Sequence, residues 1–405
     1  MEKTRRNFVK SGALLGVGGL AGCMGSSDSS TGNDSDNVII GSNHPLTGGL
    51  SYTGGRMDEA MKLAARIKND NGGIASLGGA NISVISGDNE GSQELGSEVT
   101  NNLIDQGASV ISGCYSSPVT SAASIAAERA GIPFVVSVSV ANSILQERKM
   151  DYVYRPSPNA DQFAIDHAKL MPEVASSGGI DVQTAALFYI DISFGQSIRD
   201  KLITELPKYD IEVVADLPIN FGESADTQVT RLRQESPDVV IATTYNAETV
   251  ELARSMDAQS YSPKIFAGCA SAALTDISSI AQMGDTAQGA LGTNYAVNQN
   301  LDRAVTIQNL FEAEIGSNFD ANPAMAFATM QVIIEAIEQA GSTNPSDIND
   351  ELKDIVVDDH ILAAPPITFD DRGENQNALT PLYQVQNERP VLVAPDEYAW
   401  TEAKF

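Results

Sequence analysis

Basic residues are scarce in this sequence. Only 25 of its 405 residues are Lys or Arg, against 53 Asp and Glu, so the formal net charge is −28. A chain with this balance lacks the basic stripe that binding to a DNA or RNA backbone requires. It also lacks the basic patch that holds a protein on an anionic lipid surface. We therefore exclude nucleic-acid binding and charge-driven membrane binding as functions.

The acidic residues are spread along the chain, and lysine is scarcer than arginine. Such a surface is typical of proteins from salt-saturated organisms. At 1 M salt the screening length is only about 3 Å, which weakens the repulsion that an excess of acidic groups causes. The composition thus predicts a halophilic protein, with an ordinary acidic soluble protein as the alternative.

Cysteine and histidine are also few, with three of each. Cys114 and Cys269 are far apart and have no Cys-x-x-Cys spacing, so we expect two free thiols, with a disulfide between them as the alternative. His44, His167 and His360 are scattered and give no metal-ligand spacing. No nucleophile elbow, phosphate-binding loop or calcium loop is present. The sequence therefore predicts no metal, no cofactor and no catalysis; an enzyme is the alternative.

The first 23 residues have the pattern of an export signal. Arg5 and Arg6 resemble a twin-arginine signal, and an apolar, glycine-rich stretch follows over 12–22. This stretch is shorter than the roughly 20 apolar residues that span a bilayer, but it suits the apolar region of a signal peptide. It ends in Leu-Ala-Gly-Cys, which resembles a lipobox. We expect cleavage before Cys23 and a lipid on its sulfur, which would anchor the protein to the outer face of the cell membrane.

Residues 24–36 are mostly Ser, Gly and Asp. A segment of this composition cannot bury apolar area, so we expect a flexible tether. Such a tether between a lipid and a folded body predicts that the body lies outside the membrane and close to its surface.

Residues 37–405 alternate short apolar runs with amphipathic stretches, which predicts β-α-β units and parallel sheets. Two such series predict two α/β lobes. The first series has expected strands over 38–41, 82–86, 110–112 and 132–136 and helices over 55–68, 92–106 and 119–130. The second has expected strands over 184–189, 211–217, 239–242 and 264–267 and helices over 194–206, 226–234 and 247–259. Two further helices over 302–315 and 323–340 and strand-like segments over 368–370 and 380–385 complete the expected elements.

The loops that follow the expected strands are rich in Ser, Thr, Asn, Gly and aromatic residues. In parallel sheets, ligands bind beyond the carboxyl ends of the strands. Hydroxyls and helix N-terminal N–H groups suit a carboxylate, an amide or a carbonyl. The alternative for each single residue is a helix cap. For the whole set of loops, the pattern predicts a binding cleft between the lobes.

Several runs, in their order and spacing, resemble type I periplasmic solute-binding proteins of the leucine/isoleucine/valine-binding kind. These are receptor subunits of ABC importers, and the resemblance covers nearly all of residues 37–405. The runs that carry it are Val38 to Gly54, Asn71-Gly72-Gly73-Ile74, Gly87-Asp88-Asn89, Gly113 to Pro118, Ala130-Gly131-Ile132-Pro133, Tyr154-Arg155-Pro156 and Ile367 to Gly373.

The resemblance implies two doubly wound α/β lobes joined by a three-strand hinge. Lobe 1 would comprise 37–155 plus 295–365, and lobe 2 would comprise 156–294 plus 366–405. With the acidic composition, it implies a haloarchaeal, monomeric lipoprotein outside the cytoplasm that binds a small-molecule ligand by hinge closure. Its partners would be an ABC permease and the ATPase subunits of that permease. A receptor that passes a ligand signal to a signalling or chemotaxis partner is the alternative.

The resemblance and the loops together select ten candidate ligand-binding residues: Thr53, Ser116, Ser117, Ser137, Ser139, Asp161, Asp191, Phe194, Tyr245 and Cys269. Two family positions differ here, because Ala141 stands for a ligand-binding threonine and Ala270 for the acid that pairs with a ligand ammonium. A buried ammonium without an acceptor is costly. Either Asp161 or Asp191 replaces that acid, or the ligand is an amide, a urea-like compound or another polar metabolite. We expect a branched-chain or other amino acid first, and an amide or urea-like compound next.

Overall fold

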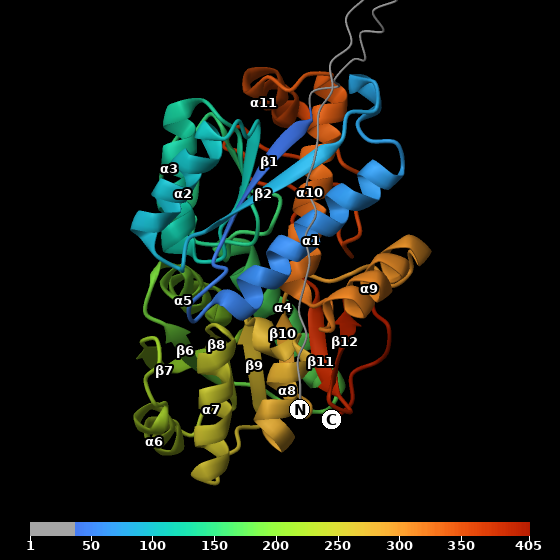
Figure 1. The fold of residues 1–405 in the computed structure, drawn as a ribbon. Helices are drawn as coiled ribbons and strands as arrows, with labels where there is room; N and C mark the ends of the chain where they lie inside the picture. Colours follow the sequence, from blue (N-terminus) through green and yellow to red (C-terminus); the bar gives the residue numbers. More distant parts are fainter. Residues whose placement is uncertain (1–36) are drawn as a thin grey trace, which may run out of the picture. The chain divides into compact units, whose positions relative to one another are not determined.

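The computed structural model describes residues 37–405. The predicted signal peptide over 1–23, with Cys23, and the predicted tether over 24–36 lie outside the described residues. Within residues 37–405, two β-sheets each carry helices on both faces (Figure 1). No helix of this range is both long and apolar enough to cross a membrane.

The first sheet has five parallel strands in the order β2-β1-β3-β4-β5. Helices α2 and α3 pack together on one face, and α1 and α10 pack together on the other. The bounds are β1 Val38–His44, β2 Ile82–Asp88, β3 Val110–Gly113, β4 Phe134–Val136, β5 Val153–Tyr154, α1 Ser51–Asp70, α2 Gln93–Asp105, α3 Ser117–Ala130, α10 Ala321–Ala340 and α11 Pro345–Asp354.

The second sheet has seven strands in the order β12-β11-β10-β9-β8-β6-β7. The strands β6 to β10 run parallel, whereas β11 and β12 add an antiparallel edge. The bounds are β6 Thr184–Ile190, β7 Glu212–Ile219, β8 Val239–Thr243, β9 Ile265–Cys269, β10 Leu291–Thr293, β11 Leu382–Gln386, β12 Arg389–Ala394, α4 Ala160–Ser177, α5 Ser193–Glu205, α6 Asp226–Glu235, α7 Asn246–Ala258 and α8 Ile277–Met283. Helix α9, Asp302–Ile315, follows β10 but contacts α1 of the first lobe.

These sheets confirm the predicted fold class, an α/β protein with two doubly wound, mainly parallel lobes. Strands that are covered on both faces read as continuous apolar runs rather than alternating ones. Strand β8 (VVIAT) and strand β9 (IFAGC) are buried at every position. Strand order reverses beside β1 and beside β6, and such reversal points are where open α/β sheets place their ligands.

One expectation about local structure was wrong. Residues 368–370 form no strand; Phe369 only makes an isolated bridge to Asn375. Residues 160–162 belong to helix α4. The Asn159 side chain accepts a hydrogen bond from the Gln162 N–H and thereby caps the start of this helix.

Three segments connect the two sheets: one from β5 to α4, one from β10 to α9, and one from α11 to β11. Isolated backbone bridges join them, Arg155 to Glu374 and Val297 to Leu362. The Arg155 side chain is fully buried and forms an ion pair with Glu374. Its guanidinium also donates to the carbonyl oxygens of Ser139 and Ala141, at 3.2 and 2.9 Å. The connecting segments are therefore tied to the loop that follows β4.

Candidate functional site

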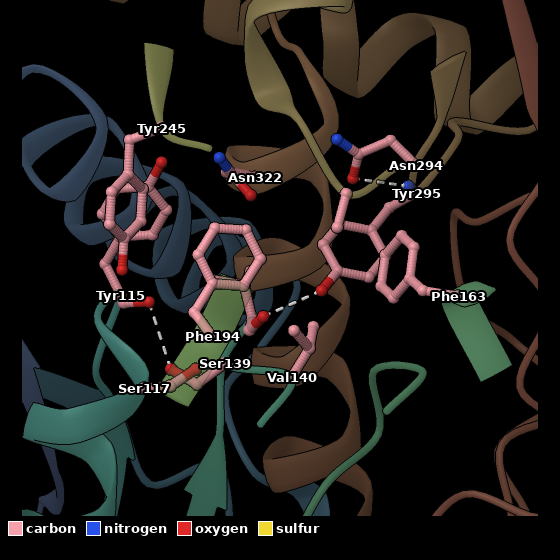
Figure 2. Close-up of a pocket in the computed structure, with 12 residues that line it drawn as sticks. Tyr115, Ser117, Ser139, Val140, Phe163, Phe194, Tyr245, Asn294, Tyr295 and Asn322 are labelled. Carbon is pink, nitrogen blue, oxygen red and sulfur yellow. Dashed lines mark hydrogen bonds between the residues drawn. The ribbon is translucent and has the colours of Figure 1, made fainter. Parts of the chain in front are cut away.

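A cavity with about 30 Å³ of free space, partly open to solvent, lies between the two sheets (Figure 2). This volume is about that of one water molecule and far below the range for small-molecule pockets, roughly 300–1,000 Å³. The first lobe contributes Tyr115, Ser117, Val138, Ser139, Val140, Tyr295 and Asn322, and the second contributes Phe163, Phe194, Tyr245, Ala270 and Asn294. In Figure 2, Ser117 and Ser139 lie at one end of this set, and Asn294 and Asn322 lie at the other.

The first lobe's wall is built from the loops that follow β3 and β4. Strand β3 ends at Gly113, with φ at +154°, where a Cβ would lie 2.2 Å from the Asn43 carbonyl oxygen. Only glycine therefore fits at this turn. The Ser139 hydroxyl contacts the Thr120 hydroxyl at 2.5 Å and lies 3.1 Å from the carbonyl oxygen of Tyr115. Ser139 thus joins the two loops, and its hydroxyl is already engaged within the protein.

Ser117 is placed differently, as the first residue of α3. Its hydroxyl oxygen accepts a hydrogen bond from the Ala141 N–H at 3.3 Å, and this is its one hydrogen bond among the described residues. The hydroxyl proton therefore remains available to an acceptor in the cavity.

Aromatic rings from both lobes meet at Tyr245. Its ring centroid lies 4.9 Å from that of Tyr115, 5.2 Å from Phe194 and 5.6 Å from Phe221. These separations are within the range of favourable aromatic pairs. The Tyr245 hydroxyl is buried close to Ser116. The cluster therefore closes one side of the cavity.

Tyr295, which follows β10, lies where the chain passes from the second lobe to the first, and it contacts both. Its hydroxyl donates to the Val138 carbonyl oxygen at 2.8 Å, and its ring packs edge-on against Phe163 at 5.5 Å (Figure 2). The Asn294 side-chain oxygen accepts from the Tyr295 N–H at 2.9 Å.

The cavity wall carries no charge, because none of its twelve lining residues is acidic or basic. Burial raises the pKa of Tyr115, Tyr245 and Tyr295, so these phenols stay protonated at neutral pH. Across residues 37–405, no three His, Cys, Asp or Glu side chains gather as they would around a metal ion. The wall is suited to hydrogen bonding and apolar contact rather than to proton transfer.

A wider groove of about 730 Å³ adjoins this cavity and shares Tyr115 and Tyr245 with it. Its lining, unlike that of the cavity, includes charged residues: Glu90, Glu248, Arg254 and Asp276. Burial raises the pKa of Glu248.

At this groove, α1 of the first lobe meets the start of α8 of the second. The Tyr52 hydroxyl donates to Asp276 at 3.1 Å, and the Arg56 guanidinium lies 3.5 Å from the same carboxylate. Arg56 also forms an ion pair with Asp320, which caps α10. This group ties the two lobes together at the mouth of the cavity.

The ten predicted residues fall into three groups. Ser117, Ser139, Phe194 and Tyr245 line the cavity, and Thr53 lines the groove. Ser116, Ser137 and Cys269 are buried beside lining residues without being part of the wall. Asp161 and Asp191 lie outside both linings. Ligand contact by any of them stays a prediction.

Both acids have partners of their own. Asp161 is in the first turn of α4, where it accepts from the Asn142 amide at 2.7 Å and pairs with Lys201 at 3.3 Å. Asp191 accepts from the Gln196 amide at 2.8 Å. Ala270, in contrast, lines the cavity. The described cavity therefore contains no substitute for the missing acid.

Sequence reasoning did not select Tyr115, Phe163, Asn294, Tyr295 and Asn322, which also line the cavity. Tyr115 belongs to a loop that the strand pattern had identified. The others follow the three-residue strand β10 or lie in the first turns of α4 and α10, where no sequence motif marks them. Cys114 and Cys269 are free and buried, which confirms the two predicted thiols.

Comparison with known proteins agrees with this architecture. A family model described as periplasmic binding protein matches residues 37–389. The Leu/Ile/Val-binding protein homolog 8 of Brucella abortus is 25% identical over 379 residues, which cover 91% of this chain and 93% of that protein.

Two solved structures show the same fold. The LivJ substrate-binding protein of Streptococcus pneumoniae, in complex with isoleucine, superposes with a TM-score of 0.75 at 18% identity, covering 89% of this chain and all of the other. A solute-binding protein of Rhodopseudomonas palustris in complex with benzoate superposes with a TM-score of 0.75 at 17% identity, covering 90% of this chain and 99% of the other. The family model spans most of the chain, and the chain therefore belongs to the periplasmic binding protein family.

Proposed function

We propose that this protein is the extracytoplasmic solute-binding component of an ABC importer and takes a small polar metabolite into the cavity between its lobes. One observation carries this proposal. Side chains of both lobes line one uncharged cavity, so a solute held there would contact both lobes at once. The family and the Leu/Ile/Val-binding relatives support the same role.

The binding cycle follows from those shared contacts. The moving bodies would be lobe 1 (37–155 plus 295–365) and lobe 2 (156–294 plus 366–405), with the three connecting segments as the hinge. A solute in the open form touches one lobe, whereas in the closed form it touches both. Because the closed form binds more tightly, the solute shifts the equilibrium towards closure. The permease then recognises the closed form.

The location is proposed from the first 36 residues of the sequence. Export by the twin-arginine route and a lipid on Cys23 would hold a monomeric receptor at the outer face of the membrane, beside its permease and the ATPase subunits. Mass spectrometry of the mature protein tests this directly. A diacylglyceryl group on an N-terminal Cys23 supports it, and a mature chain that begins elsewhere contradicts it.

The related structures bind solutes of two kinds, isoleucine in one and benzoate in another. The sequence favoured an amino acid first and an amide or urea-like compound second. Isothermal titration calorimetry in high KCl over amino acids, amides, urea and carboxylates, with small-angle scattering of each mixture, tests the role. We expect one solute class to bind and to lower the radius of gyration. If no solute binds and scattering never changes, the proposed function fails.

A further inference from the structure

The solute of the proposed function needs more room than the small cavity offers. The cavity has about 30 Å³ of free space, close to the volume of one water molecule, whereas the adjoining groove has about 730 Å³. Pockets for small molecules measure roughly 300–1,000 Å³. The first lobe lines the groove with Tyr52 and Tyr115, among others, and the second with Phe221, Tyr245 and Glu248. A solute in the groove would therefore also contact both lobes.

Glu248 is a buried acid without a partner. It is the third residue of α7, lines the groove and is only 4% exposed. Its Oε2 atom is buried and has no hydrogen-bond partner among residues 37–405. Burial raises the pKa of this carboxyl and outweighs the nearby backbone N–H groups of Glu248 and Gly222, which lower it. A buried charge in this position is costly until a cation or a donor meets it.

The other buried acids in the described part of the chain all have partners. A Lys or Arg side chain pairs with each of Asp58, Glu205, Asp276, Asp320 and Glu374. Asp166 accepts hydrogen bonds from the Thr380 N–H and hydroxyl, both at 2.9 Å. Glu248 differs from all of these, and its place on the groove wall indicates that the solute supplies the partner.

Aromatic rings lie beside this carboxylate. Burial and, to a smaller extent, the Glu248 charge raise the pKa of Tyr115 and Tyr245, so both phenols are close to it. The Phe221 ring stacks on the Tyr245 ring at 5.6 Å and is 51% exposed. Aromatic faces attract cations. A buried carboxylate with rings beside it is therefore suited to an organic cation.

The groove offers no corresponding partner to an anion. Arg254 is the one basic residue in the described lining; it is exposed and donates to the Gln282 carbonyl and side-chain oxygens at 3.4 and 3.3 Å. Of the lining acids, Asp276 is already in an ion pair and Glu90 is exposed. Salt screens exposed charges strongly and buried charges much less. The charge that decides binding in concentrated salt is therefore Glu248, and it selects a cation.

We propose, on the basis of the function proposed above, that the groove binds an organic cation whose ammonium N–H donates to Glu248 and whose apolar body lies against Phe221. Glu248 comes from the start of α7, whereas the family resemblance places an acid for a ligand ammonium after β9, where Ala270 stands. A primary amine with a flat apolar body meets this description. An α-amino acid brings a carboxylate that no buried cation of the groove meets.

Five probes built on one ring separate the alternatives: benzylamine, benzyltrimethylammonium, benzyl alcohol, benzoate and L-phenylglycine, which is benzylamine with an added carboxylate. Calorimetry and small-angle scattering with the full chain in high KCl should show benzylamine binding at least tenfold more tightly than benzyl alcohol, benzoate or phenylglycine, with closure of the lobes. Benzyltrimethylammonium, a cation without an N–H, should bind at least threefold more weakly than benzylamine.

Glu248→Gln keeps the shape of the side chain and removes its charge. It should weaken benzylamine binding at least tenfold and leave benzyl alcohol binding unchanged. Because Gln also accepts hydrogen bonds in the first turn of a helix, the melting temperature should not fall. Glu251→Gln is the matched control, since Glu251 lies on the same helix outside the groove lining; we expect no change in binding.

Phe221→Leu tests the ring. It should weaken benzylamine binding about three- to fivefold through the lost aromatic face. Phe405→Leu is its control, because Phe405 is equally exposed, at 51%, and lies outside the groove lining. Circular dichroism in the same salt checks that each variant folds; should Glu248→Gln fail to fold, the Phe221 and Phe405 pair decides.

The outcomes separate the two proposals. Tighter binding of phenylglycine or isoleucine than of benzylamine, with closure, overturns this inference and leaves the solute-binding role intact. Equal affinity for benzylamine and benzyl alcohol overturns it as well, as does benzylamine binding that survives Glu248→Gln. If none of these probes binds, the inference fails, and the proposed function fails with it only if no solute of the wider panel closes the lobes.

Discussion

Arg56 offers the sharpest test of how the lobes hold each other. This side chain extends from α1 of the first lobe and is buried between Asp276, at the start of α8 in the second lobe, and Asp320, at the start of α10. Its guanidinium also lies over the Tyr52 ring, 4.6 Å from the centroid. Arg56→Met would leave two buried carboxylates without the cation between them.

The free energy lost with this side chain should affect both the stability of the first lobe and the closure of the two lobes. Removing one partner of a buried ion pair costs about 3–5 kcal/mol. The contact with Asp320 lies within the first lobe, so its share lowers the melting temperature whether the lobes are open or closed. The contact with Asp276 joins the lobes, and a hydrogen bond to a charged group contributes about 1.5–3 kcal/mol. That share should weaken ligand binding roughly tenfold to hundredfold, since each 1.4 kcal/mol is a factor of ten.

Calorimetry with the ligand identified for the wild type measures this change, and scattering reports the open fraction. Arg66→Met is the matched control, because Arg66 lies on the same helix in an exposed pair with Glu314 and is 48% exposed. Such surface pairs contribute about 0–1 kcal/mol. The Arg56 effect should persist in high salt, since buried pairs are screened little. Unchanged affinity and unchanged scattering for Arg56→Met would refute the interlobe role.

Three further changes test the scaffold. Arg155→Met should destabilise the protein by about 3–5 kcal/mol, because it leaves the buried Glu374 carboxylate without its cation. In a double-mutant cycle followed by denaturant unfolding, adding Glu374→Met should recover much of the lost stability. Gly113→Ala should lower stability by about 1–3 kcal/mol, because the added Cβ would lie 2.2 Å from the Asn43 carbonyl oxygen. Gly55→Ala, on an open helix face, should raise stability by up to about 1 kcal/mol. Equal shifts in melting temperature for the two variants would contradict this. Burial opposes ionisation of Glu338, but hydrogen bonds from Lys68 and from backbone N–H groups outweigh it and lower its pKa from 4.5 to about 2. Its stabilisation is therefore present above pH 4.5 and lost as the pH falls towards 2, and Glu338→Gln should unfold with a shallower acid dependence.

The fold was largely predictable because its strands are covered on both faces. Such strands read as short apolar runs, and the amphipathic helices between them repeat with a period of 3.6 residues. The expected helix over 302–315 coincides with α9. Pairings without periodicity were not predictable: β10 has three residues, and the bridge at Phe369 involves a single position.

The site was predictable only where it follows strands. Ser117, Phe194 and Tyr245 stand just beyond β3, β6 and β8, so the topology rule found them. Asn322 comes from the start of α10, more than 180 positions along the chain from Ser139, and only tertiary packing brings the two to one cavity. The surroundings of the acids were not predictable for another reason. A sequence shows that Asp161 is charged, but not that Asn142 and Lys201 already satisfy it.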